Sequence, residues 1–232
     1  MMATYGRLAT RCPSIARSET SNASFQPDLP NMSGILQLPD RLLLPLRFDA
    51  HRMQEDLSQL ESGEWMEHFV TQNFDGCWSV IPLRGPAGAT HPVMMMYSDP
   101  ACETFADTTF LSRCVYFPEV LAAFPFPLDA VRLMKLTPGS SIKEHRDHDL
   151  AFESGAIRIH VPVVTHPLVE FRVNGTRVVL DEGTAWYLRL SDPHSVANHG
   201  ETDRVHLVID ARRSPELDAW FTTLDLESEV AA

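Results

Sequence analysis

The sequence predicts a mainly β protein, a jelly roll with flanking α-helices. Turn signals such as Pro138-Gly139 and Asn174-Gly175 divide the second half of the 232-residue chain into short segments rich in apolar residues. Asn-Gly between apolar flanks favours a hairpin with a type I′ turn, because both residues tolerate positive φ. Eight such segments at this spacing favour a closed or double-sheet β architecture: 131–137, 141–147, 156–164, 168–173, 176–181, 184–190, 194–198 and 204–211.

The first half of the chain predicts a mixed α/β flank. Asp49 is a good N-cap for a helix over residues 50–61, and Gly63 is a stop signal. The other elements expected before the core are an extended segment over 35–47, one or two strands over 74–98, and a helix in two pieces over 103–123 that is interrupted near Phe117-Pro118.

These segments predict one domain over residues 35–232. Its parts are the flank over 35–125, the jelly-roll core over 130–212, and a C-terminal helix and tail over 214–232 that begins at Ser214-Pro215-Glu216. Residues 1–34 are rich in Ser, Thr, Arg and Pro and predict a disordered extension, or an upstream start codon with Met32 near the true start. An organellar presequence is the alternative.

Composition excludes several classes of function. A net charge of −12 disfavours nucleic acid as a partner, because the chain repels phosphate backbones. No apolar run approaches the length that crosses a bilayer, so no membrane partner is expected. The four cysteines form no CxxC pair, which disfavours a zinc ribbon or a disulfide framework and favours reduced thiols in a cytoplasmic protein.

A candidate metal site begins in the second of the eight segments. His145 and Asp147 are two residues apart on a predicted strand, so their side chains share one face. His194 follows 47 residues after Asp147, at the start of another strand. Two histidines and one carboxylate make a facial triad that leaves coordination positions open, which is typical of non-haem iron(II) oxygenases. Taken alone, a His-x-Asp pair is more often a solvated strand edge.

Polar residues that alternate with apolar ones on the predicted strands indicate a polar interior. Arg204 heads an apolar run, where an unpaired buried arginine would be costly, and its planar fork suits a carboxylate. The alternative is that Arg204 pairs with Asp203, Asp210 or another acid. Four more polar residues follow the same alternation and are candidates to line this interior: Arg132, Arg158, His160 and His206. For each of them taken alone, a structural role is at least as good an explanation as ligand binding.

These residues stand in segments that closely resemble the aspartyl/asparaginyl β-hydroxylase domain family. The resemblance covers about residues 130–212, and its motifs appear in order with compatible spacing: MKLTPGSSIKEHRD (134–147), IRIHVPVVT (157–165), GTAWYL (183–188), PHSVAN (193–198) and DRVHLVID (203–210). Residues 35–125 match only loosely. The resemblance implies a double-stranded β-helix, which is a cupin-like jelly roll, and a reaction that uses iron(II), 2-oxoglutarate and dioxygen.

The resemblance also implies roles for individual residues. His145, Asp147 and His194 fall on the metal positions, and Arg204 falls on the position that grips the distal carboxylate of 2-oxoglutarate. Asp147 indicates the bacterial branch with a full triad. The remaining correspondences are an Arg-x-His pair that lines the cosubstrate pocket, Arg158 and His160, and an arginine near the site of the related proline cis-hydroxylases, Arg132.

The expected function is that of an oxidoreductase, a dioxygenase that hydroxylates an amino acid or an aspartyl/asparaginyl-type peptide and releases succinate and carbon dioxide. Trp186 is expected to pack the core first and to form a substrate wall second. The alternatives are a cupin-like module that binds metal or carboxylate without turnover, a purely structural jelly roll, and a zinc hydrolase on the same ligands. The substrate and the oligomeric state stay open.

Overall fold

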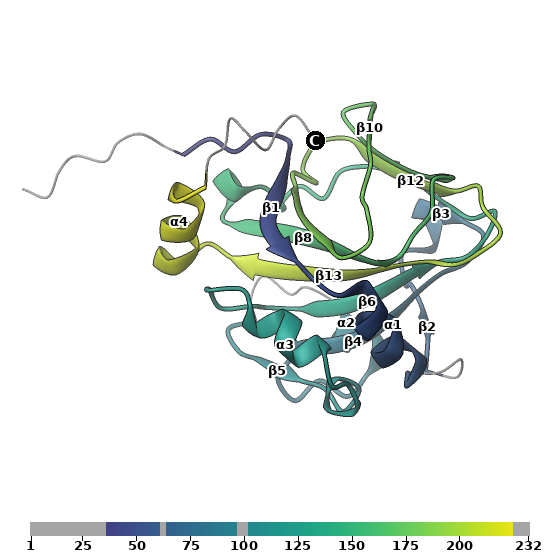
Figure 1. Cartoon of the computed structure of the whole chain (residues 1–232), viewed down its shortest axis with the longest axis horizontal. Coiled ribbons are helices and arrows are strands. Elements are labelled where there is room, and N and C mark those ends of the chain that lie inside the picture. The colour runs from purple at the N-terminus through teal and green to yellow at the C-terminus, as the bar shows by residue number, and fades with distance from the viewer. Residues whose placement is uncertain (1–35, 61–63, 97–101, 225–232) are drawn as a thin grey trace, which may run out of the picture. The chain divides into compact units, whose positions relative to one another are not determined.

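The computed structural model describes residues 36–60, 64–96 and 102–224, which fold into two antiparallel sheets with helices beside them (Figure 1). The expectations on residues 1–34 and on Gly63 lie outside the described residues. None of the helices in the described part of the chain has the length and apolar composition that crossing a bilayer requires.

The larger sheet has eight strands. Its main path runs β1-β11-β8-β13-β6-β4-β2, and β5 pairs with β4 at one side. Pro45 lies in the edge strand β1, where a missing backbone N–H is tolerated. The strands in path order are β1 (Arg41–Arg47), β11 (Thr184–Leu188), β8 (Ala156–Val164), β13 (Arg204–Arg212), β6 (Val131–Leu136), β4 (Trp78–Pro86), β2 (Met66–Glu67) and β5 (Phe105–Asp107).

The smaller sheet has five strands, and its central part supplies the second layer of the predicted jelly roll. The order is β10 (Thr176–Val178), β9 (Val169–Val173), β12 (His194–Asn198), β7 (Ser141–His145) and β3 (Phe74–Asp75). From β6 onward the chain passes back and forth between the sheets, so that β6-β13-β8-β11 of the larger sheet lies opposite β7-β12-β9-β10 of the smaller one. This double-stranded β-helix confirms the fold class that the sequence predicts. Asn174 and Gly175 have φ of 51° and 72° in the β9–β10 turn, as a type I′ turn requires.

Alternation along the strands separates two apolar clusters. In β13, Leu207 and Ile209 belong to the cluster on the outer face of the larger sheet, while Val208 belongs to the cluster between the two sheets. Arg204, His206 and Asp210 share the parity of Val208 and therefore point between the sheets. The period of two thus brings polar side chains of β13 into the interior of the jelly roll.

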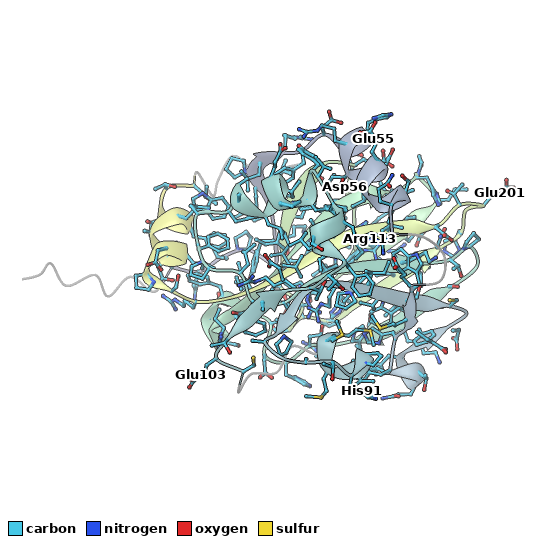
Figure 2. The ribbon with its side chains drawn as sticks, turned by 90° about the horizontal axis from the view of Figure 1, so that it is seen from below. Glu55, Asp56, His91, Glu103, Arg113 and Glu201 are labelled. Atoms are coloured by element: carbon cyan, nitrogen blue, oxygen red, sulfur yellow. The ribbon has the colours of Figure 1, made fainter. Side chains whose placement is uncertain are left out.

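Three helices pack against the outer face of the larger sheet (Figure 1). Asp49 caps α1 (Ala50–Ser58) by accepting from the Arg52 backbone N–H at 3.2 Å, and Ser214 caps α4 (Pro215–Thr222) in the same way. Figure 2 shows Glu55 at the outer edge of α1, whereas Asp56 points inward toward the chain that leads into α3 (Phe117–Ala122). The remaining short helices are η1 (Thr71–Asn73), α2 (Pro92–Met96), η2 (Leu111–Arg113) and η3 (Phe152–Ser154).

The predicted helix over residues 103–123 is wrong in its first part. The region contains the strand β5, the single 3-10 turn η2 and the helix α3, which begins at Phe117. Pro118 lies in the first turn of α3, where its fixed φ suits a helix and its missing N–H is no loss, so it starts the helix and does not interrupt one. Residues 92–96, expected within a strand region, form α2.

Candidate metal centre and the adjoining cleft

Three side chains that the sequence singles out meet at the mouth of the jelly roll. His145 ends β7, His194 begins the neighbouring β12, and the two residues are register partners. Asp147 follows in the next loop, where its backbone N–H donates to the Leu190 carbonyl at 2.8 Å. One potential ligand atom from each of His145, Asp147 and His194 lies within 4.8 Å of the others, a spacing that one metal ion can bridge.

Backbone carbonyls fix the orientation of both imidazoles. His145 Nδ1 lies 2.8 Å from the Lys143 carbonyl oxygen, and His194 Nδ1 lies 3.0 Å from the Asp192 carbonyl oxygen. A carbonyl oxygen can only accept, so each Nδ1 carries the proton and each Nε2 keeps its lone pair for a metal. Burial lowers the pKa of His194 to about 4, which keeps this ring neutral and able to coordinate at ordinary pH.

A buried cluster of charges adjoins the triad. Arg158 Nη1 donates to Asp147 Oδ2 at 2.9 Å, while its Nε and Nη2 donate to the two oxygens of Asp210 at 2.6 and 3.0 Å. Asp210 Oδ2 also accepts from Arg132 Nη2, and Arg132 Nη1 donates to the Met96 carbonyl oxygen. Burial acts to lower the pKa of Arg158, but Asp210 and Asp147 together raise it above its ordinary value. Arg158 therefore stays charged and holds one oxygen of Asp147.

A second buried arginine lies deeper between the sheets and has a different environment. Arg204 is 1% exposed, and among the residues that the structure describes it forms no ion pair with an acid. Its Nη2 donates to His206 Nδ1 at 2.6 Å, and its Nε has no hydrogen-bond partner in the described chain. Burial lowers the pKa of Arg204 to about 9, because no anion there compensates for the lost hydration.

His160 links this arginine to the metal centre. His160 Nδ1 lies 3.3 Å from His206 Nδ1, and its ring stacks edge-on against Phe171 at 5.4 Å between centroids. Burial, followed by the charges of Arg204, Arg158 and His194, lowers the pKa of His160 well below its ordinary value. His160 is thus a neutral, buried residue near both Arg204 and His194.

An open cleft of about 530 Å³ leads to the triad. His145, Asp147 and the Arg132–Asp210–Arg158 cluster border one part of it, whereas Arg204, His160 and His206 are enclosed behind it and do not line it. Apolar or aromatic side chains make up much of the rest of its lining, among them His68, Phe69, Val70, Trp78, Met96, Phe105, Met134 and Leu150. Polar residues complete it: Asn73, Asp129, His148, Asp149, Ser154 and Arg212.

The structure thus brings most of the predicted site residues together, in two groups. Arg132 and Arg158 lie at the cleft, and Arg204 and His160 lie buried behind it. The alternative pairing of Arg204 with Asp203 or Asp210 is not found, since Asp203 faces Lys135 at 3.8 Å and Asp210 binds the other two arginines. Trp186 packs in the core between the sheets, donates to Thr184 Oγ1 at 3.0 Å, and does not line the cleft.

His68 is a cleft residue that the sequence does not single out. Its ring stacks flat on Trp78, with centroids 3.6 Å apart and 5° between the planes. Burial, together with Arg132 and Arg158, lowers its pKa to about 4. His68 lies in the flank that has no regular pattern, so only the pairing of β2 with β4 brings it next to Trp78.

The chain is similar in sequence to known proteins. A protein-family profile described as "Aspartyl/Asparaginyl beta-hydroxylase" matches residues 47–214. L-proline cis-4-hydroxylase of Rhizobium meliloti (strain 1021) is 27% identical over 169 residues, a match that covers 71% of this chain and 58% of that protein. The chain therefore spans little more than half the length of this curated relative.

Solved structures also align with the chain. An oxidoreductase of the 2OG-Fe(II) oxygenase family from Burkholderia pseudomallei is 15% identical with a TM-score of 0.48, and the alignment covers 75% of this chain and 86% of that one. HygX from Streptomyces hygroscopicus, solved with nickel and 2-oxoglutarate bound, is 13% identical with a TM-score of 0.47, with 76% and 84% covered.

Proposed function

Since the chain belongs to the aspartyl/asparaginyl β-hydroxylase family, we propose that it is an iron(II)- and 2-oxoglutarate-dependent hydroxylase of an amino acid or an aspartyl/asparaginyl-type peptide. One observation carries this proposal. A His-Asp-His cluster whose Nε2 atoms are available to a metal occurs in the same jelly-roll interior as a buried arginine for which the described residues offer no acid.

The donor set fits iron(II). His145 and His194 would each give Nε2, and Asp147 would give Oδ1, because Arg158 occupies Oδ2. Two imidazoles and one carboxylate suit iron(II) and leave room for further ligands. When bound, iron(II) would activate dioxygen, the oxidant of the reaction, so that one oxygen atom oxidises 2-oxoglutarate to succinate and carbon dioxide and the other hydroxylates a C–H bond of the substrate.

Arg204 fits the distal carboxylate of 2-oxoglutarate. A planar guanidinium binds a carboxylate through two parallel hydrogen bonds, and a dry environment strengthens such a pair. Burial without an acid is costly unless an anion arrives, so the surroundings of Arg204 favour a ligand with a carboxylate at this end. His160, which lies near both Arg204 and His194, would then border the cosubstrate along its length.

The cleft supports an amino acid or peptide as the substrate. The curated relative named above acts on proline, a small zwitterion. The cleft borders Arg132, Arg158 and Asp210 on its charged part and aromatic residues such as His68 and Trp78 on the other. This combination matches a ligand with a polar backbone and a less polar side chain.

The test is succinate formation with iron(II), dioxygen, 2-oxoglutarate and a panel of free amino acids and end-blocked peptides. We expect succinate that depends on 2-oxoglutarate and rises with one member of the panel. Asp147→Ala should abolish it, whereas Glu144→Ala, an exposed acid beside His145, should not. Binding of iron and 2-oxoglutarate without any succinate would favour the binding module. Hydrolysis of a substrate without 2-oxoglutarate would favour the zinc hydrolase.

A further inference from the structure

One buried residue beside Arg204 has no role in the proposed function so far. His206 lies two residues after Arg204 on β13, so both side chains point between the sheets. It is fully buried, and its Nδ1 accepts from Arg204 Nη2 at 2.6 Å. Among the described residues, His206 is the side chain that accepts a hydrogen bond from the Arg204 guanidinium.

Hydrogen bonding defines the state of this imidazole. A guanidinium can only donate, so His206 Nδ1 must hold a lone pair and the ring proton must be on Nε2. Burial, followed by the charges of Arg204 and His160, lowers the pKa of His206 well below its ordinary value, in agreement with a neutral ring. The Arg204 bond uses the one lone pair of His206 Nδ1, so His160 Nδ1, 3.3 Å from the same nitrogen, is a close contact and not a second strong hydrogen bond.

A neutral acceptor leaves the positive charge of Arg204 uncompensated. An acid at this position would fix the guanidinium equally well but would neutralise it, leaving no charge for an incoming carboxylate. Without any acceptor, the long side chain would lose its fixed orientation and a buried N–H would be unpaired. A neutral histidine provides the orientation and leaves the positive charge unused.

We propose that His206 is a positioning residue that holds the Arg204 guanidinium in its carboxylate-binding orientation without neutralising its charge. This inference rests on the proposed function, because it assigns the carboxylate to 2-oxoglutarate. If it is right, substitutions of His206 should change the affinity for 2-oxoglutarate. They should leave the affinity for iron(II) unchanged, because the triad does not touch His206.

Three substitutions separate the effects of shape, hydrogen bonding and charge. In His206→Asn, the amide Oδ1 takes the place of Nδ1 as a neutral acceptor, and 2-oxoglutarate affinity should stay within about threefold of wild type. His206→Leu removes the acceptor, which corresponds to about 10–100-fold weaker binding for a lost hydrogen bond to a charged group. His206→Asp keeps the acceptor but adds a negative charge, and affinity should fall by at least about 100-fold.

The experiment is an anaerobic titration of the full-length protein, first with iron(II) alone and then with 2-oxoglutarate, together with thermal unfolding of each metal-free variant. We expect unchanged iron affinity in all three variants and a melting temperature for His206→Asp no lower than that of His206→Asn. His199→Leu, at an exposed position in the turn before β13, is the matched control and should bind like wild type.

The inference is overturned if folded His206→Asp binds 2-oxoglutarate within threefold of wild type. It is also overturned if the Leu and Asn variants bind equally. Failure of the proposed function looks different, because the wild-type protein itself would then bind iron without binding 2-oxoglutarate.

Discussion

Replacing Asp210 by asparagine should destabilise the protein and weaken its metal site together. Asp210 is 4% exposed, and its two oxygens accept from both Arg158 and Arg132, the latter also 4% exposed. An amide leaves one of these buried positive charges uncompensated and turns an NH₂ group toward a guanidinium. Breaking a buried ion pair from one side costs about 3–5 kcal/mol, so we expect this loss in the free energy of unfolding.

The same substitution should also affect the metal site, because Arg158, which Asp210 holds in place, donates to Asp147 Oδ2. Loss of a group that orients a metal ligand lowers affinity by about 10–100-fold, and we expect this for iron(II). The assays are urea unfolding of the metal-free protein and anaerobic iron titration.

The matched control is Asp203→Asn, a more exposed acid whose partner Lys135 is 3.8 Å away. Its effect should stay within about 0.5 kcal/mol. An Asp210→Asn protein as stable as the control would refute the charge-cluster reasoning.

Three further predictions concern stability. Burial lowers the pKa of His68, His160, His194 and His206 below the ordinary value of 6.5, to about 4 for His68 and His194. As pH falls below 6.5, the unfolded chain therefore binds protons at these histidines before the folded chain does. The free energy of unfolding of the metal-free protein should fall as pH drops from 6.5 toward 4. The loss at pH 5.5 should total about 5 kcal/mol in urea unfolding, at roughly 1.4 kcal/mol for each of the four histidines, and a flat profile between pH 7.5 and 5.5 would contradict it. Asp56→Ala should cost about 2–4 kcal/mol, because Asp56 accepts from the backbone N–H groups of Val115, Tyr116 and Phe117 at 2.7–2.8 Å; the exposed neighbour Glu55→Ala is the control, and equal effects would contradict the assignment. Gly183→Ala should destabilise more than Gly175→Ala, since both have positive φ but only at Gly183 would a Cβ lie 2.2 Å from the Phe48 carbonyl oxygen; equal melting temperatures would contradict this.

Alternation along strands made much of the interior predictable from the sequence. Arg204 and His206 share a face with Val208, and Arg158 and His160 share a face because they are two residues apart, so their common direction follows from strand geometry alone. The triad was recognisable because His145 and Asp147 are close in sequence and because the motifs resemble a known family.

Pairing partners were harder to predict than faces. Strand parity places Asp210 in the interior, but only the registers of β13 with β6 and β8 bring it beside Arg132 and Arg158 and leave Arg204 without an acid. The flank was less predictable for a different reason. Its short elements depend on tertiary pairing, as β5 does on β4, so local propensity wrongly favoured helix in the part of residues 103–123 that precedes α3.

The most direct test of the proposed function is an anaerobic titration of iron(II)-loaded protein with 2-oxoglutarate, which monitors the weak visible charge-transfer band of the chelate. The band should form in wild type and should be lost or strongly weakened in Arg204→Ala. Arg213→Ala, which removes an exposed arginine directly after the same strand, should behave like wild type. Absence of the band in folded, iron-loaded wild type would contradict the proposal and would favour a binding module in its place.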